Sequence, residues 1–243
     1  MHAMNAGLLK VPCQEVNTQL LFVGGVILIM PIEFCNVNKS FTPDTVVLNN
    51  VSFNLEWKSC NWLKGDNGSG KTTIIRLMVG LLKPDSGYVK IMGLDPYYDI
   101  SPRQFIGFIM NKEGTDPLLT ARENLEFFYR VYKKTRLPHH ESEFALERVG
   151  LGDYSDKKVR TFSTGMKKRL EIAKLMLCEP RIIICDEPFS GLDEQGVVLF
   201  KEFIKHSLKN DVCILISEHN ERNVEGVCDK KLIINHGLIS NFN

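Results

Sequence analysis

The amino-acid sequence predicts an α/β fold with a mostly parallel sheet and a helical insert. From Pro31 onward, short runs of β-branched residues alternate with segments of helical periodicity, a rhythm typical of α/β folds. Residues 112–162 differ, because they contain helical patterns and no strand pattern. With 243 residues, of which 44% are hydrophobic and 24% charged, the chain can form one large or two small globular domains.

Three apolar segments are the clearest strand predictions. Residues 46–55 (VVLNNVSFNL) read as a strand, and residues 181–186 (RIIICD) and 212–217 (VCILIS) read as buried central strands. Between the last two, apolar side chains recur at helical spacing. They predict a crossover helix and are Val197, Phe200, Ile204 and Leu208.

The helical insert is predicted to contain two helices. The first follows a capping box, in which Thr120 and Glu123 satisfy backbone amides at the helix start. The second covers residues 139–151 (HHESEFALERVGL). We therefore expect a helical unit set into an α/β core.

The first 29 residues differ from the rest of the chain and allow two interpretations. Their apolar run, Leu20–Met30, is too short to span a bilayer as a helix. A secretion signal is disfavoured, because positive charge at the start is weak and no small-residue cleavage site follows. We predict either a poorly ordered extension over residues 1–29 or a misassigned start site, with the functional domain over residues 30–243. No later run reaches 18 apolar residues, so no transmembrane helix is expected.

The net charge and the cysteine content limit the partners and the cell compartment that are expected for this chain. A formal net charge of +1 gives no electrostatic reason to expect a nucleic-acid partner. The seven cysteines are scattered, odd in number and without a CxxC pair. This pattern predicts reduced core thiols in the cytosol.

The segment GDNGSGKTT, residues 65–73, matches the phosphate-loop motif G-x-x-x-x-G-K-[ST]. Glycines let consecutive N–H groups turn inward around an anion, and the following helix adds its dipole. Lys71 would reach the terminal phosphates, and the Thr72 hydroxyl would coordinate Mg²⁺. A glycine-rich turn with an incidental lysine is the alternative, which the strand before and the helix after disfavour. The predicted ATP contacts here are Gly65, Asn67, Gly68, Ser69, Gly70, Lys71, Thr72 and Thr73.

Two carboxylates, Asp186 and Glu187, follow the buried strand at residues 181–186. They would lie at the carboxyl edge of the sheet, where open α/β sheets bind ligands. Asp186 is predicted to hold Mg²⁺ through water. Glu187 is predicted to polarise a water for attack on the γ-phosphate and, by strand alternation, to point to the opposite face.

Further motifs resemble those of the ATPase subunits of ABC transporters. FSTGM at residues 162–166 is similar to the family's LSGGQ signature, and SGLD at residues 190–193 is similar to its D-loop. SEHN places His219 where the family has its switch histidine. The resemblance runs from Pro31 to the end of the chain. It implies the ABC ATPase fold: a phosphate-loop NTPase core, an antiparallel β subdomain and an inserted helical subdomain.

The resemblance also implies that ATP is bound between two chains. Ser163, Thr164 and Gly165 open a helix whose free N–H groups and dipole favour an anion. In the family this helix faces ATP held by the other subunit's phosphate loop. Asp193, in the D-loop, is likewise implied to contact nucleotide. Taken alone, the segment would be an ordinary helix cap.

Two single residues gain roles from the resemblance. His219 is implied to contact the γ-phosphate, where the alternative is a simple loop residue. Phe41 would stack on adenine, in a position before the first strands where the family usually has tyrosine. The alternative for Phe41 is a core aromatic.

The chain departs from the family pattern at three positions. Asn111 replaces a glutamine that helps to ligate Mg²⁺, and it is one methylene, about 1.5 Å, shorter. Metal geometry or coupling to the insert is therefore expected to differ, unless Lys112 or Glu113 substitutes. Thr164 and Met166 replace a glycine and a glutamine of the signature, and neither change removes a backbone donor.

These observations predict the ATP- and Mg²⁺-dependent subunit of a transporter. The implied partners are separate membrane permease subunits and a second ATPase subunit, either an identical copy or a related chain. The location is then the cytoplasmic face of the membrane, and export is the expected direction. The alternatives are a soluble ABC ATPase serving an iron–sulfur scaffold type of assembly, and a low-turnover nucleotide-dependent regulator motivated by Asn111.

Overall fold

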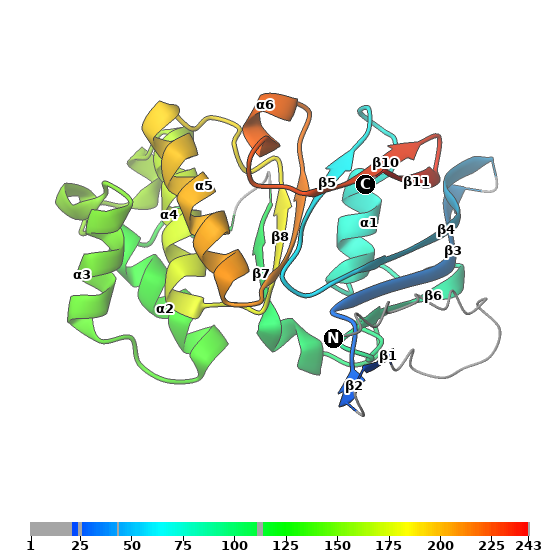
Figure 1. Ribbon diagram of the computed structural model, residues 1–243. Helices are drawn as coiled ribbons and strands as arrows, with labels where there is room; N and C mark the ends of the chain where they lie inside the picture. Colours follow the sequence, from blue (N-terminus) through cyan, green and yellow to red (C-terminus); the bar gives the residue numbers. More distant parts are fainter. Residues whose placement is uncertain (1–20, 24–25, 43, 111–113, 243) are drawn as a thin grey trace, which may run out of the picture.

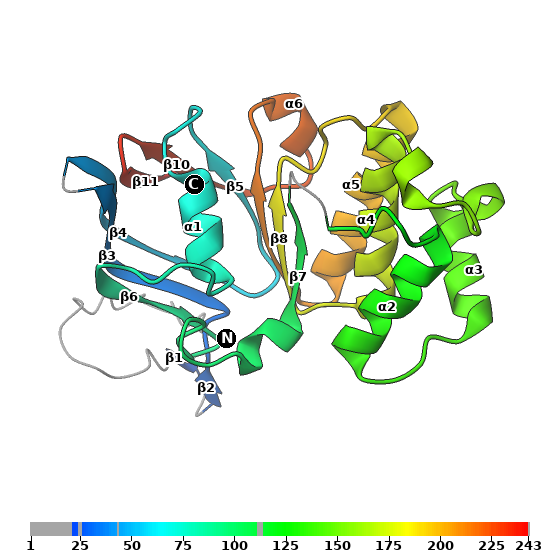
Figure 2. The same ribbon diagram turned by 180° about the vertical axis from the view of Figure 1, so that it is seen from behind.

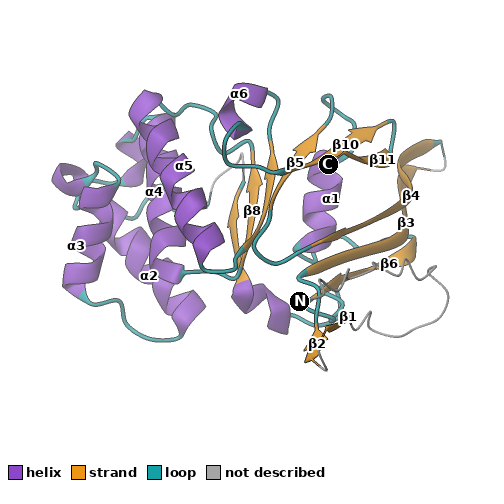
Figure 3. Ribbon diagram, in the orientation of Figure 1, coloured by secondary structure: helices purple, strands orange, loops and turns teal. Residues whose placement is uncertain are grey.

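The computed structural model describes residues 21–23, 26–42, 44–110 and 114–242. Its helices gather mainly at one end of the molecule and its antiparallel strands at the other, with a parallel sheet between them (Figure 3). The α-helices in these residues are α1 (Lys71–Met78), α2 (Ala121–Lys133), α3 (His139–Arg148), α4 (Thr164–Cys178), α5 (Glu194–Lys209) and α6 (Glu221–Val224). The described part contains no helix with the length and apolar character needed to cross a bilayer.

The central sheet is mostly parallel, as predicted. Within the described chain it has six strands, of which all neighbouring pairs are parallel except the pair β10 and β11. In spatial order the strands are β11 (Leu238–Phe242), β10 (Lys230–Asn235), β5 (Cys60–Lys64), β9 (Cys213–Ser217), β8 (Ile182–Asp186) and β7 (Ile106–Ile109). The parallel strands end at one edge, where the arrowheads of β5 and β8 are seen in Figure 1.

Alternating side chains of β8 pack into two separate hydrophobic clusters. Ile183 and Cys185 join the cluster formed with α2 to α5, whereas Ile182 and Ile184 join the cluster formed with α1 and the antiparallel sheet. This two-residue period is what an apolar strand covered on both faces requires. Helix α1 and helices α2 to α5 therefore lie on opposite sides of β8 (Figures 1 and 2).

The crossover helix predicted between the last two buried strands is α5. It connects β8 to β9 and packs with Phe200 and Ile204 fully buried, while Val197 and Leu208 are half-buried. The helix thus covers the sheet with the face that its apolar spacing indicated.

A second, antiparallel sheet covers α1 from the other side. Its strands, in the described residues, are β4 (Thr45–Leu55), β3 (Ile32–Thr42) and β6 (Ser86–Ile91), in the order β4-β3-β6. Upstream, β1 (Leu21–Val23) pairs with β2 (Val26–Leu28), within the segment interpreted as an extension. Residues 1–20 lie outside the described part, so the domain boundary near residue 30 stays a prediction.

The described part of the predicted insert, residues 114–162, contains α2, α3 and two short 3-10 turns, η2 (Gly152–Tyr154) and η3 (Val159–Thr161). The predicted capping box is present at the start of α2. Thr120 Oγ1 accepts the Glu123 N–H at 3.1 Å, and Glu123 Oε2 accepts the Thr120 N–H at 2.7 Å.

Loss of this cap should destabilise the chain measurably. We expect Thr120→Ala to cost about 1 kcal/mol, which corresponds to about 2–4 °C in Tm for a chain of this size. Differential scanning calorimetry measures the shift. Thr135→Ala is the matched control, because Thr135 is exposed and lies outside the helices. Equal Tm values for the two variants would contradict the role of the cap.

Candidate functional site

The phosphate loop connects β5 to α1 and closes around its own lysine. The Lys71 ammonium donates to the carbonyl oxygens of Gly65 at 2.7 Å and Asp66 at 2.9 Å. The lysine is only 7% exposed, so its charge is held inside the loop. Asn67 and Gly68 lie exposed on the loop, and Thr73 is buried in the first turn of α1.

The glycines of this loop are required by its geometry. A Cβ on Gly65 would lie 2.6 Å from the carbonyl oxygen of Ile234, and Gly70 begins α1 with a left-handed φ of 113°. Ser69 Oγ is buried and has no hydrogen-bond partner within the described residues. A buried hydroxyl without a partner beside a helix start and a lysine fits an incoming phosphate oxygen.

Asp186 ends β8 opposite the first turn of α1. Its Oδ2 lies 3.5 Å from Thr72 Oγ1, and its Oδ1 accepts the Ser217 hydroxyl at 2.5 Å. One carboxylate and one hydroxyl, with phosphate oxygens and water completing the shell, are the donors that Mg²⁺ prefers. Asp186 and Thr72, predicted as metal ligands, are thus brought together and fit the ion.

Glu187 leaves the strand with a left-handed φ of 49°, so strand alternation does not orient it. The orientation argument in the sequence prediction was therefore wrong. Its N–H donates to the Ser217 carbonyl oxygen at 3.0 Å and to Ser217 Oγ at 3.2 Å, so its backbone still pairs with the end of β9. The Glu187 carboxylate lies 2.9 Å from His219 Nε2. Glu187 and His219, which were predicted separately, are therefore in direct contact.

The lysine and the two carboxylates influence one another electrostatically. Burial lowers the pKa of Lys71, and the nearby charges of Glu187 and Asp186 oppose that shift. All three groups therefore face a common region at the carboxyl edge of the sheet. An anionic ligand there would add to the charges that keep the lysine protonated.

The signature segment begins α4, as predicted. Ser163 is its N-cap and accepts the Met166 N–H at 3.2 Å. A Cβ on Gly165 would come within 2.6 Å of the Gly191 carbonyl oxygen, so the signature and the D-loop touch backbone to backbone. Thr164 Cγ2 lies against Gly191 from the same turn.

Asp193 has structural partners in this chain. It caps α5 by accepting the Gly196 N–H at 2.8 Å, and both its carboxylate oxygens accept from Arg169 Nη2, at 2.5 and 2.6 Å. These hydrogen bonds hold the pKa of Asp193 below its usual range. The nucleotide contact implied for Asp193 stays a prediction.

The structure describes Phe41, the residue predicted to stack on adenine, but not Asn111, a predicted metal ligand. Phe41 lies within β3, next to its end, because β3 keeps pairing with β4 as far as Thr42. The expected position before the first strands was therefore wrong, and an exposure of 53% excludes the core alternative. Stacking on adenine stays a prediction. Asn111, with Lys112 and Glu113, lies outside the described residues.

Three residues at the site were not predicted. Ser217 bonds to both Asp186 and Glu187, Arg169 bonds to Asp193, and the buried Glu218 accepts the backbone N–H groups of His219 and Asn220 at 2.8 and 3.0 Å. The pairing of β8 with β9 could have indicated Ser217, since residues that end neighbouring parallel strands meet at one edge.

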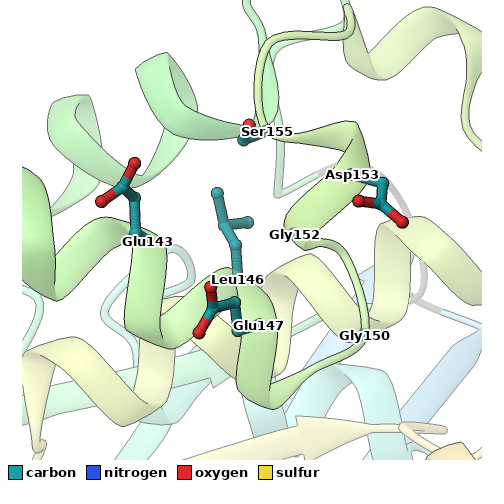
Figure 4. Close-up of a pocket in the computed structure, with 7 residues that line it drawn as sticks. All are labelled: Glu143, Leu146, Glu147, Gly150, Gly152, Asp153 and Ser155. Carbon is teal, nitrogen blue, oxygen red and sulfur yellow. The ribbon is translucent and has the colours of Figure 1, made fainter.

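A hollow of about 430 Å³ lies elsewhere, on the helical insert (Figure 4). It contains no residue of the phosphate loop or of the carboxyl edge, so it is separate from the site described above. Its lining residues are Glu143, Leu146, Glu147, Gly150, Gly152, Asp153 and Ser155.

Comparison with known proteins decides the family. The model of the family described as "ABC transporter" matches residues 48–190, more than half of the chain. The chain belongs to the ABC transporter family. Nod factor export ATP-binding protein I of Burkholderia lata is 35% identical over 211 residues, which cover 86% of this chain and 69% of that protein. The uncharacterized ABC transporter ATP-binding protein YybJ of Bacillus subtilis is 34% identical over 208 residues, covering 86% and 94%.

Solved structures agree with this assignment. A structure titled as the ATP binding subunit of an ABC transporter has a TM-score of 0.79 at 27% identity, covering 87% of this chain and 89% of that one. A dimeric ATP-binding cassette bound to ADP and Pi has a TM-score of 0.77 at 22% identity, covering 87% and 99%, and shows the shared fold. The ABC ATPase fold predicted from the sequence is confirmed, and the chain is an ATP-binding ATPase subunit of this family.

Proposed function

We propose that this ABC ATPase binds Mg-ATP between its phosphate loop and the signature of a second ATPase subunit, and that hydrolysis drives export through separate permease subunits. The observation that carries the proposal is the Glu187–His219 contact of 2.9 Å next to the Lys71 loop. The contact supports the proposal because Glu187 could accept a proton there and His219 could orient it beside the phosphate loop.

The chain's own residues supply binding and charge at the triphosphate. Lys71, the loop N–H groups and Ser69 Oγ would hold phosphate oxygens, and Thr72 and Asp186 would hold Mg²⁺. When bound, Mg²⁺ neutralises charge that develops on the phosphate oxygens. The Ser217 hydroxyl keeps Asp186 in place.

Hydrolysis then requires a water in line with the γ-phosphorus. Glu187 would orient this water and accept its proton as the new P–O bond forms and the bond to the bridging oxygen of ADP breaks. His219 would contact the γ-phosphate and fix the Glu187 carboxylate. Glu218 supports this by holding the backbone at His219.

A second subunit is inferred because the two helix starts that could bind anions belong to helices packed on different faces of the sheet. Helix α1 and helix α4 lie on opposite sides of β8, and α4 starts against the D-loop at Gly191. The free N–H groups at Ser163 and Gly165 can therefore serve a nucleotide held by another copy or a related chain. The family resemblance supports this arrangement.

The relatives support the proposed partner, direction and location. The similarity to a protein named as a Nod factor export subunit supports export, and the family's use of permeases supports a place at the cytoplasmic face of the membrane. The cargo would then be chosen by the permease, because the site described above recognises only nucleotide.

Affinity purification from detergent extract tests the partner. We expect the tagged full chain to retain an integral membrane protein in a fixed ratio, and the complex in nanodiscs to release phosphate from ATP. A soluble scaffold protein as the stable partner would contradict transport and favour a cytosolic assembly function.

A further inference from the structure

Three charged residues lie buried along one face of α4, away from the phosphate loop. Lys168, Glu171 and Lys174 are 5%, 5% and 4% exposed, respectively. Their spacing of three residues keeps them on neighbouring positions of the helix surface. Buried charges destabilise a protein unless they are paired and hydrogen-bonded, so each of the three needs partners.

Lys174 and Glu171 form an ion pair, with 2.7 Å between Nζ and Oε1. The Lys174 ammonium also donates to the carbonyl oxygen of Gly114 and lies 3.6 Å from the centroid of the Phe128 ring. Burial lowers the pKa of Lys174 and raises that of Glu171, and each charge opposes the shift in the other. Coulomb attraction within the pair therefore favours the charged form of each group, against the effect of burial.

The ion pair also contacts the backbone of Gly114. A Cβ on Gly114 would lie 2.6 Å from Glu171 Oε2 and 2.7 Å from Oε1, so the carboxylate packs directly on that glycine. One turn earlier, Lys168 Nζ donates to the carbonyl oxygen of Met110 at 3.5 Å. Helix α4 thus binds the chain at two points, Met110 and Gly114.

The first of these points, Met110, lies beside the catalytic edge. Met110 directly follows β7, whose last residue, Ile109, pairs with Cys185, the neighbour of Asp186. Helix α4 begins at Thr164, directly after its N-cap Ser163 in the signature. Lys168 therefore connects the signature helix to the end of β7. Glu171 and Lys174 connect it to Gly114, four residues after Met110.

We propose that Glu171 and Lys174 are positioning residues for ATP hydrolysis, because their ion pair fixes Gly114 on α4 and makes the signature helix and the catalytic edge move together. The inference rests on the ATPase function proposed above. The two residues act through Gly114, and neither is placed against substrate. Displacements of about 1 Å at such supports can lower turnover about 100-fold.

Single and double variants separate positioning from stability. Glu171→Gln and Lys174→Met each leave one buried charge unpaired, so both should lower Tm. The double variant removes both charges, so its Tm should return to within about 3 °C of the wild type, since buried pairs are often replaceable by uncharged side chains. The kcat of the double variant should still be at least about tenfold lower than that of the wild type, because no ammonium holds the Gly114 carbonyl oxygen. KM and the affinity for a fluorescent ATP analogue should change less than about twofold.

Lys174→Arg keeps a cation and a donor and should retain at least about half of wild-type turnover. The matched control is Glu202→Gln with Lys205→Met, an exposed pair on α5 with the same spacing and the same substitutions, which should leave Tm and kcat unchanged. The inference is overturned if the Glu171 and Lys174 double variant regains both Tm and kcat, or if Lys174→Arg loses as much turnover as Lys174→Met. Absence of turnover in the wild type would instead overturn the ATPase function itself and, with it, this inference.

Discussion

Glu187→Gln should lower ATP turnover by about 10²- to 10⁴-fold while leaving ATP affinity nearly unchanged. The amide cannot accept the proton of the attacking water, yet it keeps the size of the side chain and can still bond to His219, 2.9 Å away. Phosphate release gives turnover, and equilibrium binding of a fluorescent ATP analogue gives affinity.

The same variant should accumulate as an ATP-bound dimer, because nucleotide that is not hydrolysed stays between the subunits. Size-exclusion chromatography with and without Mg-ATP measures this. Glu202→Gln, at an exposed position on α5, is the matched control and should hydrolyse ATP as the wild type does. Equal and negligible rates for Glu187→Gln and the wild type would remove catalysis and favour the low-turnover regulator.

Lys71→Met should weaken ATP binding about 10- to 150-fold, which corresponds to the loss of one charge-assisted hydrogen bond of about 1.5–3 kcal/mol. In the structure the ammonium bonds to the Gly65 and Asp66 carbonyl oxygens, so it is already held inside the loop that would receive phosphate. Isothermal titration with Mg-ATP measures the change. Turnover at saturating ATP should fall as well, since the cation offsets charge on the transferring phosphoryl group.

The stability of Lys71→Met should distinguish a binding defect from misfolding. Burial lowers the pKa of this lysine, so replacing it with an apolar side chain of similar length should not lower Tm. Lys205→Met, exposed on α5, is the control for loss of a lysine and should bind ATP normally. Unchanged ATP affinity and phosphate release in Lys71→Met would contradict the nucleotide site.

Much of the fold could be predicted because the sequence patterns are local. Apolar periodicity identified β8, β9 and the crossover α5, and the capping box marked the start of α2. Each of these signals is complete within a few neighbouring residues. The phosphate loop is likewise contiguous, so Gly65 to Thr73 could be recognised as one unit.

The rest of the site depends on contacts between distant segments. Ser217 reaches Asp186 only because β9 pairs with β8, and no single segment of the sequence shows this pairing. The orientation of Glu187 was predicted wrongly because its backbone, with a φ of 49°, leaves the strand conformation directly after Asp186. Phe41 was misplaced because the sequence analysis identified no strand over residues 32–42, where β3 lies.

The two hydrophobic clusters on the faces of β8 have a practical consequence. Because both are built on the same strands, the edge where nucleotide is expected to bind lies on a sheet that both clusters stabilise. Ligand bound there should therefore raise the melting temperature of the whole molecule, by an amount set by its concentration relative to Kd. A dye-based thermal-shift assay can thus rank nucleotides and inhibitors before any cargo has been identified.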